Sequence, residues 1–413
     1  MNRTTFSELY KDTDRQTARY RRLAGEFEEL FGCKPKRYFS ASGRTEVIGN
    51  HTDHNHGRVM AAAVNLDIIA AASANDTSVV TVKSEGFDAD VIDISSLEPK
   101  PQETNKSASL IRGVCAGLKN RGYKIGGFDA YTTSDVLKGS GLSSSAAFEV
   151  LVGTIINHLY NDGKISAVEI AQVAQYAENV YFGKPSGLMD QMASSVGGFI
   201  SIDFEDTSAP VIEAIDYDLS KSGYSLCIVD TRGSHAELTP EYAAIPDEMK
   251  AVAGYFGKEY LRQLSKQDVL DNVAALREKF GDRAVLRAFH FFDENERVIR
   301  LAAALKNGDF DAFLECINES GDSSYKYLQN VYAGSMPKNQ SVSVALYMCD
   351  MLMQGSGASR VHGGGFAGTI QAFVKNDMLD GFINGMESVF GSGSCHVLNV
   401  RKQGGTEVTE VSL

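Results

Sequence analysis

Hydrophobic residues near the start of the chain recur at helical spacing. Tyr20, Leu23, Phe27 and Leu30 are separated by three or four positions, so they fall on one face of a helix. Charged residues fill most of the positions between them. The spacing therefore predicts an amphipathic N-terminal helix whose apolar face packs on a core.

After residue 38 the pattern changes to short β-branched runs that are separated by turn residues. The segments TEVIG, AVNLDIIAAAS and SVVTVKS have the length and composition of strands, so a sheet is expected up to about residue 92. Further along, three helices and one strand are predicted, over residues 109–121, 145–160 and 167–182 (helices) and 126–133 (strand).

Two strands, FISIDF and YSLCIVDT, are predicted after a Gly-Gly pair, and we place a domain boundary there. The expected domains are residues 1–213 and 214–413. The second contains a largely helical region, 241–318, and two further strands, TIQAFV and CHVLNV. Because strands and helices are mixed without strict β-α-β alternation, the expected fold class is α+β, with mixed sheets flanked by helices.

The length and composition argue for a folded protein of more than one domain. The 413 residues exceed one typical hydrophobic core, and 43% hydrophobic against 23% charged residues provides enough apolar material for sizeable cores. With 40 basic against 53 acidic residues, the net charge of −13 disfavours nucleic acids and anionic membranes as partners. The longest apolar stretch, from Met60 to Ser73, is interrupted by Asn65 and Asp67 and is too short to span a bilayer.

The cysteines and the N-terminus favour a cytoplasmic enzyme. The six cysteines include no CxxC pair and no disulfide-dense spacing, so we expect reduced thiols. The first thirty residues are charged throughout and lack an apolar core, so no signal peptide is expected.

A glycine- and serine-rich segment, KGSGLSSSAA (138–147), leads directly into a run with helical spacing. Small residues let the backbone approach an anion, the serines add hydroxyl donors, and a helix start supplies free N–H groups. The segment therefore predicts a phosphate site, although a flexible loop with a serine N-cap is the plainer alternative. The pattern GxxxxGK[ST] is absent from the sequence, which disfavours a P-loop NTPase.

A second polar segment, Gly43 to Gly57, holds three of the eight histidines beside an aspartate, in the order HxDHxH. The cluster is compatible with a metal site of a metallohydrolase, but no second His/Asp cluster completes a two-metal centre. A polyol site is the competing hypothesis, in which His51 and Asp53 share sugar hydroxyls and Arg44 neutralises charge. A solvated turn between two strands is also possible.

A third segment, Gly355 to Gly368, contains six glycines in fourteen residues and precedes the predicted strand TIQAFV. Such density indicates unusual backbone conformations or a close approach of the backbone to another group. A flexible linker is less favoured, because Phe366 interrupts the run and an apolar strand follows it.

Together these segments resemble the signature motifs of the GHMP small-molecule kinases, and specifically of the galactokinases. GRTEVIGNHTDHNHG is similar to the first galactokinase motif, GSGLSSSAAFEV to the phosphate loop and GASRVHGGGFAG to the third glycine motif. Two more stretches, AENVYFGKPSGLMDQMASSVGG and ENERVIRLAAALKNGDF, extend the resemblance from about Phe27 to Val400. It implies a two-domain GHMP kinase fold with the active site in the cleft between the domains. It also implies an ATP-dependent kinase that phosphorylates the anomeric hydroxyl of D-galactose.

The resemblance implies roles for individual residues. Asp190 matches the family's catalytic aspartate, and Arg44 matches the arginine beside it. Glu178 and Ser145 match the magnesium ligands, so Mg²⁺ is the expected cofactor and ATP the co-substrate. The expected phosphate contacts are Gly139, Ser140, Gly141, Ser143, Ser144 and Ser145. The expected sugar contacts are Asn50, His51, Asp53, Gly187 and Tyr242. We expect a monomer or a weak homodimer.

The sequence departs from the family pattern in the sugar motif. The galactokinases have a glutamate at the position of Asn50, and the resemblance implies that this glutamate binds the C6 hydroxyl of the sugar. An asparagine side chain is uncharged, so it would lose a charge-assisted hydrogen bond worth about 1.5–3 kcal/mol. We therefore hypothesise that position 6 is read differently. Two alternatives stay open: a kinase of a related sugar such as D-galacturonate or N-acetylgalactosamine, and a non-catalytic galactose sensor. His54, His56 and His362 also depart from the usual residues.

Overall fold

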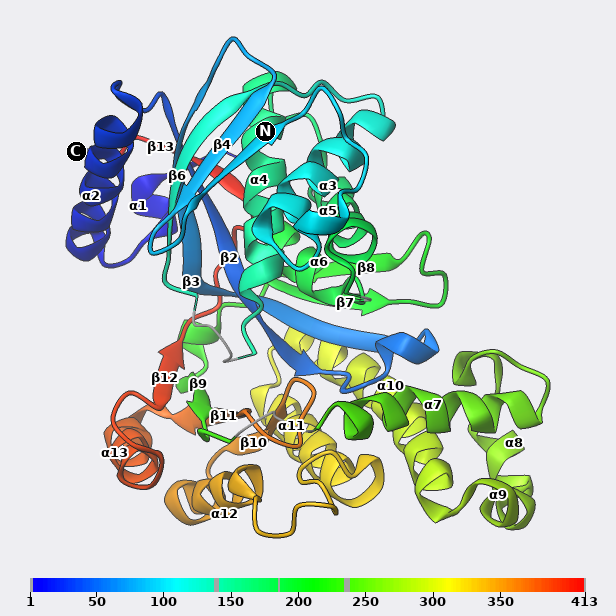
Figure 1. Cartoon of the computed structure of the whole chain (residues 1–413). Coiled ribbons are helices and arrows are strands. Elements are labelled where there is room, and N and C mark those ends of the chain that lie inside the picture. The colour runs from blue at the N-terminus through cyan, green and yellow to red at the C-terminus, as the bar shows by residue number, and fades with distance from the viewer. Residues whose placement is uncertain (1–2, 137–140, 185, 234–237, 412–413) are drawn as a thin grey trace.

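The structure, a computed structural model of the chain, describes residues 3–136, 141–184, 186–233 and 238–411. These residues form a larger mixed sheet and a smaller antiparallel sheet, both flanked by helices, the first in the upper and the second in the lower half of Figure 1. The predicted α+β class is confirmed. Among the described helices, none is both long enough and apolar enough to span a bilayer.

The larger sheet has nine strands in the described part of the chain. Its main path runs β1-β13-β2-β3-β6-β4-β5, and β7 pairs with both β3 and β8. The strands are β1 (Arg3–Thr5), β2 (Arg37–Ile48), β3 (Arg58–Ala74), β4 (Val79–Ser84), β5 (Ala89–Asp93), β6 (Phe128–Ser134), β7 (Phe199–Asp203), β8 (Val211–Ile215) and β13 (Thr406–Thr409).

Helices cover both faces of this sheet (Figure 1). Along β3, Ile69 and Ala71 pack in the cluster under α2, whereas Ala70 and Ala72 pack under α3 and α4, as the alternation of a strand requires. The helices of this half are α1 (Phe6–Leu9), α2 (Thr13–Phe31), α3 (Ser107–Asn120), α4 (Ser144–Tyr160), α5 (Ala167–Tyr176), the π-helix η3 (Ala177–Phe182) and α6 (Met189–Val196).

The smaller sheet has the order β10-β11-β9-β12. Its strands are β9 (Tyr224–Asp230), β10 (Ala358–His362), β11 (Thr369–Lys375) and β12 (Cys395–Leu398). The helices of this half are α7 (Thr239–Tyr255), α8 (Lys266–Asp271), α9 (Val273–Phe280), α10 (Asp282–Asn307), α11 (Phe310–Ser323), the π-helix η6 (Ser324–Leu328), α12 (Ser341–Met353) and α13 (Leu379–Phe390). Short 3₁₀ turns are η1 (Asp53–Asn55), η2 (Pro101–Glu103), η4 (Leu219–Lys221), η5 (Leu261–Gln263) and η7 (Asn376–Met378).

The predicted N-terminal helix is confirmed as α2, with one difference in its apolar face. Tyr20, Leu23 and Phe27 are buried, but Leu30 is 47% exposed. The stripe continues instead through Phe31, whose ring lies 4.8 Å from that of Phe27. Spacings of three and four are both helical, so the sequence alone could not choose between positions 30 and 31.

β2 and β3 connect the two halves of the molecule. Register shifts between Ser42 and Arg44 and between Glu46 and Ile48 interrupt their ladder, and such bulges bend and twist a strand pair. Beyond the bulges, the backbone N–H of Gly49 donates to Glu294 of α10 over 3.0 Å.

Three predicted elements of the second half are also confirmed: the helical region 241–318, TIQAFV as β11 and CHVLNV as β12. The predicted boundary at residue 213 falls inside β8, and β13 near the C-terminus pairs with β2 of the larger sheet. The division into residues 1–213 and 214–413 stays a prediction.

Candidate active site

The predicted phosphate segment meets the start of α4. Ser143 is the N-cap residue, with a left-handed φ of 53°, and Ser144 begins the helix. The Ser143 side chain makes no capping hydrogen bond in the described structure, so the first N–H groups of α4, which include that of Ser145, are open to an anion. Gly139 and Ser140 lie outside the described residues.

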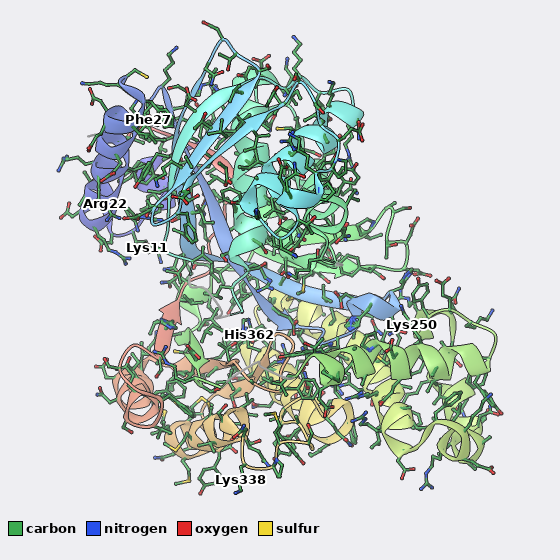
Figure 2. The ribbon with its side chains drawn as sticks, in the orientation of Figure 1. Lys11, Arg22, Phe27, Lys250, Lys338 and His362 are labelled. Atoms are coloured by element: carbon green, nitrogen blue, oxygen red, sulfur yellow. The ribbon has the colours of Figure 1, made fainter. Side chains whose placement is uncertain are left out.

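Gly141 packs against the buried ring of His362, where the two halves meet (Figure 2). A Cβ at Gly141 would lie 3.0 Å from His362 Nδ1, so the loop approaches the ring closely because this residue is glycine. Hydrogen bonds of 3.0 Å to the hydroxyls of Thr45 and Thr369 fix the ring. Burial, and then the positive charge of Arg44, lower the pKa of His362 to about 3, so the ring is neutral.

Arg44 and Asp190 form a bidentate ion pair beside this loop. Arg44 Nε donates to Asp190 Oδ1 over 2.7 Å, and Nη2 donates to Oδ2 over 2.6 Å. Its remaining nitrogen, Nη1, donates to the carbonyl of Gly141. Burial raises the pKa of Asp190, but the charge and hydrogen bonds of Arg44, together with Ser143, outweigh it and lower the pKa below its usual value. Asp190 is therefore ionised, in the first turn of α6, where a helix favours negative charge.

Glu178 lies on the π-helix η3 and is almost fully buried. Its Oε1 accepts from Ser145 Oγ over 3.2 Å and from Lys184 Nζ over 2.9 Å. Its Oε2 accepts from Ser186 Oγ and Gln191 Nε2, both at 2.7 Å. The two predicted metal ligands, Ser145 and Glu178, are therefore adjacent, and a lysine ammonium already lies against Oε1. Hard oxygen donors and a position that attracts a cation fit a divalent metal ion.

A second buried carboxyl, that of Glu149, lies behind Glu178. Gln191 Nε2 bridges the two by also donating to Glu149 Oε2 over 3.2 Å. Burial, and then the charge of Glu178, raise the pKa of Glu149 well above its usual value. The raised pKa favours the neutral acid form of Glu149.

Three consecutive glycines of the third segment contact predicted sugar residues. The carbonyl of Gly363 accepts from Asn50 Nδ2 over 2.7 Å. The carbonyls of the next two glycines accept from His51 Nε2 over 2.9 Å and from Tyr242 Oη over 2.7 Å. A Cβ at Gly364 would lie 2.7 Å from the Tyr242 ring. The glycine-rich segment is thus a place of close approach, as the sequence predicted.

The histidine cluster is linked internally. A carbonyl can only accept, so His51 donates through Nε2, and its Nδ1 lies 3.1 Å from His54 Nε2. His54 Nδ1 lies 3.1 Å from Asp53 Oδ1. Burial, and then His54, lower the pKa of His51 to about 3. His56 is separate and stacks on Tyr260 at 3.8 Å. In the described part of the chain, no group of three or more His, Cys, Asp or Glu side chains is arranged to hold a metal ion.

Asp53 meets Gly187, the residue three positions before Asp190. A Cβ at Gly187 would lie 2.5 Å from Asp53 Oδ2, so a side chain at this position would displace the carboxylate. The structure therefore places Asp53 and Gly187 in contact, and it links Asp190, Arg44 and Gly141 at the neighbouring ion pair.

Asn50 is only 1% exposed, and its amide is fully used within the protein. Nδ2 donates to Glu46 Oε1 over 2.9 Å as well as to Gly363, and Oδ1 accepts from Asn330 Nδ2 over 2.7 Å. Glu46 in turn accepts from Arg360 over 3.0 Å.

The sequence analysis missed the residues that support the predicted site: Glu46, Glu149, Lys184, Asn330 and Arg360. A helical offset of four places Glu149 beside Ser145, and this spacing could have indicated it. No local pattern joins Glu46 to Arg360, because 314 positions separate them.

Comparisons with known proteins place the chain in a family. The galactokinase galactose-binding signature matches residues 25–74, and the GHMP kinases N terminal domain matches residues 109–198. A galactokinase of Streptomyces coelicolor is 33% identical over 371 residues, which cover 89% of this chain and 92% of the relative. A galactokinase of Glaesserella parasuis is 31% identical, with 86% and 89% covered.

Solved structures show the same fold. The structure of Lactococcus lactis galactokinase complexed with galactose superposes with a TM-score of 0.78 at 25% identity, and covers 94% of this chain and 99% of that one. A mevalonate kinase superposes with a TM-score of 0.62 at 11% identity, over 88% and 99% of the two chains, which shows a shared fold alone.

Proposed function

The chain belongs to the galactokinase family, and we propose that it transfers the γ-phosphoryl group of ATP to the anomeric hydroxyl of D-galactose. The products are galactose 1-phosphate and ADP. The observation that carries this proposal is the Arg44–Asp190 ion pair, which lies between the start of α4 and the residues around Asp53. The enzyme is thus a phosphotransferase with an alcohol group as acceptor.

Asp190 acts on the acceptor hydroxyl. Both of its oxygens accept from Arg44, and its lowered pKa makes it a weak base that stays ionised and available as a hydrogen-bond acceptor. In the ground state it orients the anomeric hydroxyl, and it takes up the proton as the new P–O bond forms and the hydroxyl becomes acidic. Arg44 stabilises the carboxylate and the negative charge that develops on the transferred group. Phosphoryl transfer depends mainly on such positioning and charge stabilisation.

The phosphates bind at the start of α4. The open N–H groups of the first turn and the hydroxyls of Ser143, Ser144 and Ser145 supply donors without adding positive charge. Gly139, Ser140 and Gly141 complete the proposed loop.

A kinase family that uses ATP implies a divalent metal ion, and we propose Mg²⁺. The residues that would hold it are Ser145 and Glu178, whose oxygens are adjacent and are of the hard type that Mg²⁺ prefers. When bound, the ion would neutralise charge on the phosphates. Ser186 and Gln191 keep the Glu178 carboxylate from rotating, because both donate to Oε2.

The sugar binds beside Asp53, His51, Tyr242 and Gly187. Asp53 offers its Oδ2, which lies against Gly187, while Oδ1 is engaged by His54. Neutral His51 and Tyr242 are oriented by glycine carbonyls. The Asp53 carboxylate and the Tyr242 hydroxyl oxygen can accept a hydrogen bond from a sugar hydroxyl, whereas both ring nitrogens of His51 have protein partners, so His51 would line the pocket through its ring.

The structure changes the hypothesis about Asn50. Its amide hydrogens and its oxygen already have protein partners, so it has no free donor with which to read position 6. We propose that Asn50 shapes the pocket through Gly363 and Asn330 and that D-galactose is the acceptor. No contact among the described residues favours the carboxylate of galacturonate. The predicted cytoplasmic location and the monomer or weak homodimer stay predictions.

The test is release of ADP from ATP and Mg²⁺ with D-galactose, D-galacturonate, N-acetylgalactosamine, L-arabinose and glucose. We expect turnover to be fastest with D-galactose and to fall by about a hundredfold or more in Asp190→Asn. Faster turnover with a C6-altered sugar would replace the acceptor, and no turnover with any sugar would support the sensor instead.

A further inference from the structure

Lys184 occupies an unusual position for a surface lysine. Its side chain is 56% exposed, yet its ammonium lies 2.9 Å from Oε1 of Glu178, whose side chain is only 3% exposed. The backbone N–H of Lys184 also donates to the carbonyl of Glu178 over 3.1 Å. The turn that ends η3 therefore fixes the lysine at both its backbone and its ammonium.

The two oxygens of Glu178 differ in their partners. Oε2 accepts from two fixed neutral donors, Ser186 and Gln191. Oε1 faces Ser145 and the flexible end of Lys184. A metal ion that uses Ser145 and Glu178 together must bind Oε1, because this oxygen is the one adjacent to the Ser145 hydroxyl. The ion would therefore take the place of the lysine ammonium.

We propose that the Lys184 ammonium occupies the cation position at Glu178 and that a metal ion binds there tightly only when a nucleotide is also bound. In the nucleotide-free enzyme its ammonium neutralises Glu178 and competes with a divalent ion. A triphosphate at the start of α4 offers the displaced ammonium a new anionic partner, so metal and nucleotide bind well together and poorly apart. Lys184 is thus a positioning residue, and the inference rests on the proposed function.

Physical chemistry supports the exchange. An ammonium on a four-carbon stem can change partners by rotation of its side chain, at little cost when the stem is half exposed. A metal ion that arrives alone would break the ion pair and leave the ammonium without a partner. Arrival with ATP brings the negatively charged triphosphate to the same region, where its oxygens can accept from the displaced ammonium. The coupling between the two ligands is therefore positive and, by linkage, reciprocal.

The test measures binding rather than turnover. Mn²⁺ is titrated into the enzyme and followed by electron paramagnetic resonance, with and without a non-hydrolysable ATP analogue. Lys184→Met removes the charge at nearly constant length, and Lys184→Arg restores it. Lys266→Met is the matched control, because Lys266 is also half exposed and pairs with a carboxylate, Asp293, at 2.6 Å. Glu178→Gln supplies the background in which the competition cannot occur.

We expect Lys184→Met to bind Mn²⁺ roughly fivefold more tightly than the wild type when no nucleotide is present. The gain in Mn²⁺ affinity on adding the analogue should shrink by at least the same factor. Lys184→Arg and Lys266→Met should resemble the wild type, and Lys184→Met should have no effect in the Glu178→Gln background. Unchanged Mn²⁺ affinity in Lys184→Met, or an equal gain in Lys266→Met, would overturn the inference. Lack of sugar turnover by the wild type would refute the proposed function, but the Mn²⁺ affinities of the variants could still be compared.

Discussion

Replacing Asn50 by aspartate keeps the shape of the side chain and removes both of its donors. Two acceptors then each lose one hydrogen bond: Glu46 Oε1, now 2.9 Å away, which keeps the bond from Arg360, and the carbonyl of Gly363, at 2.7 Å. The larger cost comes from the new charge, which faces Glu46 in a site that is 1% exposed, and an uncompensated buried charge costs about 3–5 kcal/mol. We expect Asn50→Asp to lower the free energy of unfolding by about 3–5 kcal/mol at pH 8.

The loss should depend on pH with a definite sign. Burial raises the pKa of Glu46, although Arg360 opposes the rise. A second carboxylate beside it raises the folded-state pKa of the pair further above the unfolded value of about 4. The folded variant then holds a proton that the unfolded chain has released, so its stability falls as pH rises from about 4. The slope is at most about 1.4 kcal/mol per pH unit for one proton.

Urea unfolding at pH 5.5 and pH 8 checks both statements. Asn105→Asp is the control, because Asn105 is exposed and its side chain makes no hydrogen bond among those found in the described residues. The variant Asn50→Asp should lose more stability at pH 8 than at pH 5.5, while the control stays within about 0.5 kcal/mol of the wild type. If Asn50→Asp also stays within about 1 kcal/mol at both pH values, the network around Asn50 does not have the role described.

Three further predictions follow from the same geometry. Asp190→Asn should lower kcat by about a hundredfold to ten-thousandfold while the affinity for ATP, measured by calorimetry, stays close to that of the wild type; a large loss of ATP affinity would contradict its role at the acceptor. Gly187→Ala should raise the KM for galactose about tenfold with a smaller effect on kcat, because its Cβ would lie 2.5 Å from Asp53 Oδ2; an unchanged KM would remove Asp53 from the sugar site. Asp67→Asn should lower the free energy of unfolding by about 3–5 kcal/mol, since Asp67 is buried between two arginines. Burial raises the pKa of Asp67, but the arginines outweigh it and lower the pKa, so the wild type loses this stability as pH falls below about 4 and the variant does not.

The sequence predicted what local patterns encode. Helical spacing predicted α2, the β-branched runs predicted β2 to β4, and the glycine-rich third segment predicted a close approach that the structure shows at Gly363 to Gly365. The resemblance placed Arg44 and Asp190 in one site before any coordinates, and the two side chains form an ion pair. The predicted elements and the close approach of the glycines have a common cause: each of these signals lies within one turn, one strand or one motif.

What could not be predicted depends on contacts between distant segments. Asn50 was expected to face the sugar, yet the partners that use its amide come from β2, from the segment after η6 and from the segment after β10. Glu46 and Arg360 compensate each other's charge at a separation of 314 positions. A single sequence holds no periodicity at that distance, so a polar residue in a motif cannot be assigned to a ligand or to the protein interior from the motif alone.

The three acidic side chains at the centre of the site, Asp190, Glu149 and Glu178, have different surroundings, and we infer different roles for them from these surroundings. Asp190 has both oxygens engaged by Arg44, so it is unsuited to bind a metal ion and remains at the acceptor. Glu149 favours its neutral form because burial, and then the charge of Glu178, raise its pKa. Glu178 has one oxygen, Oε1, whose partners among the described residues are a hydroxyl and the end of a lysine side chain. Without these different partners, three carboxyls in one small region would repel each other and compete for the same cation. Their partners therefore separate the proposed metal site from the site of the acceptor hydroxyl.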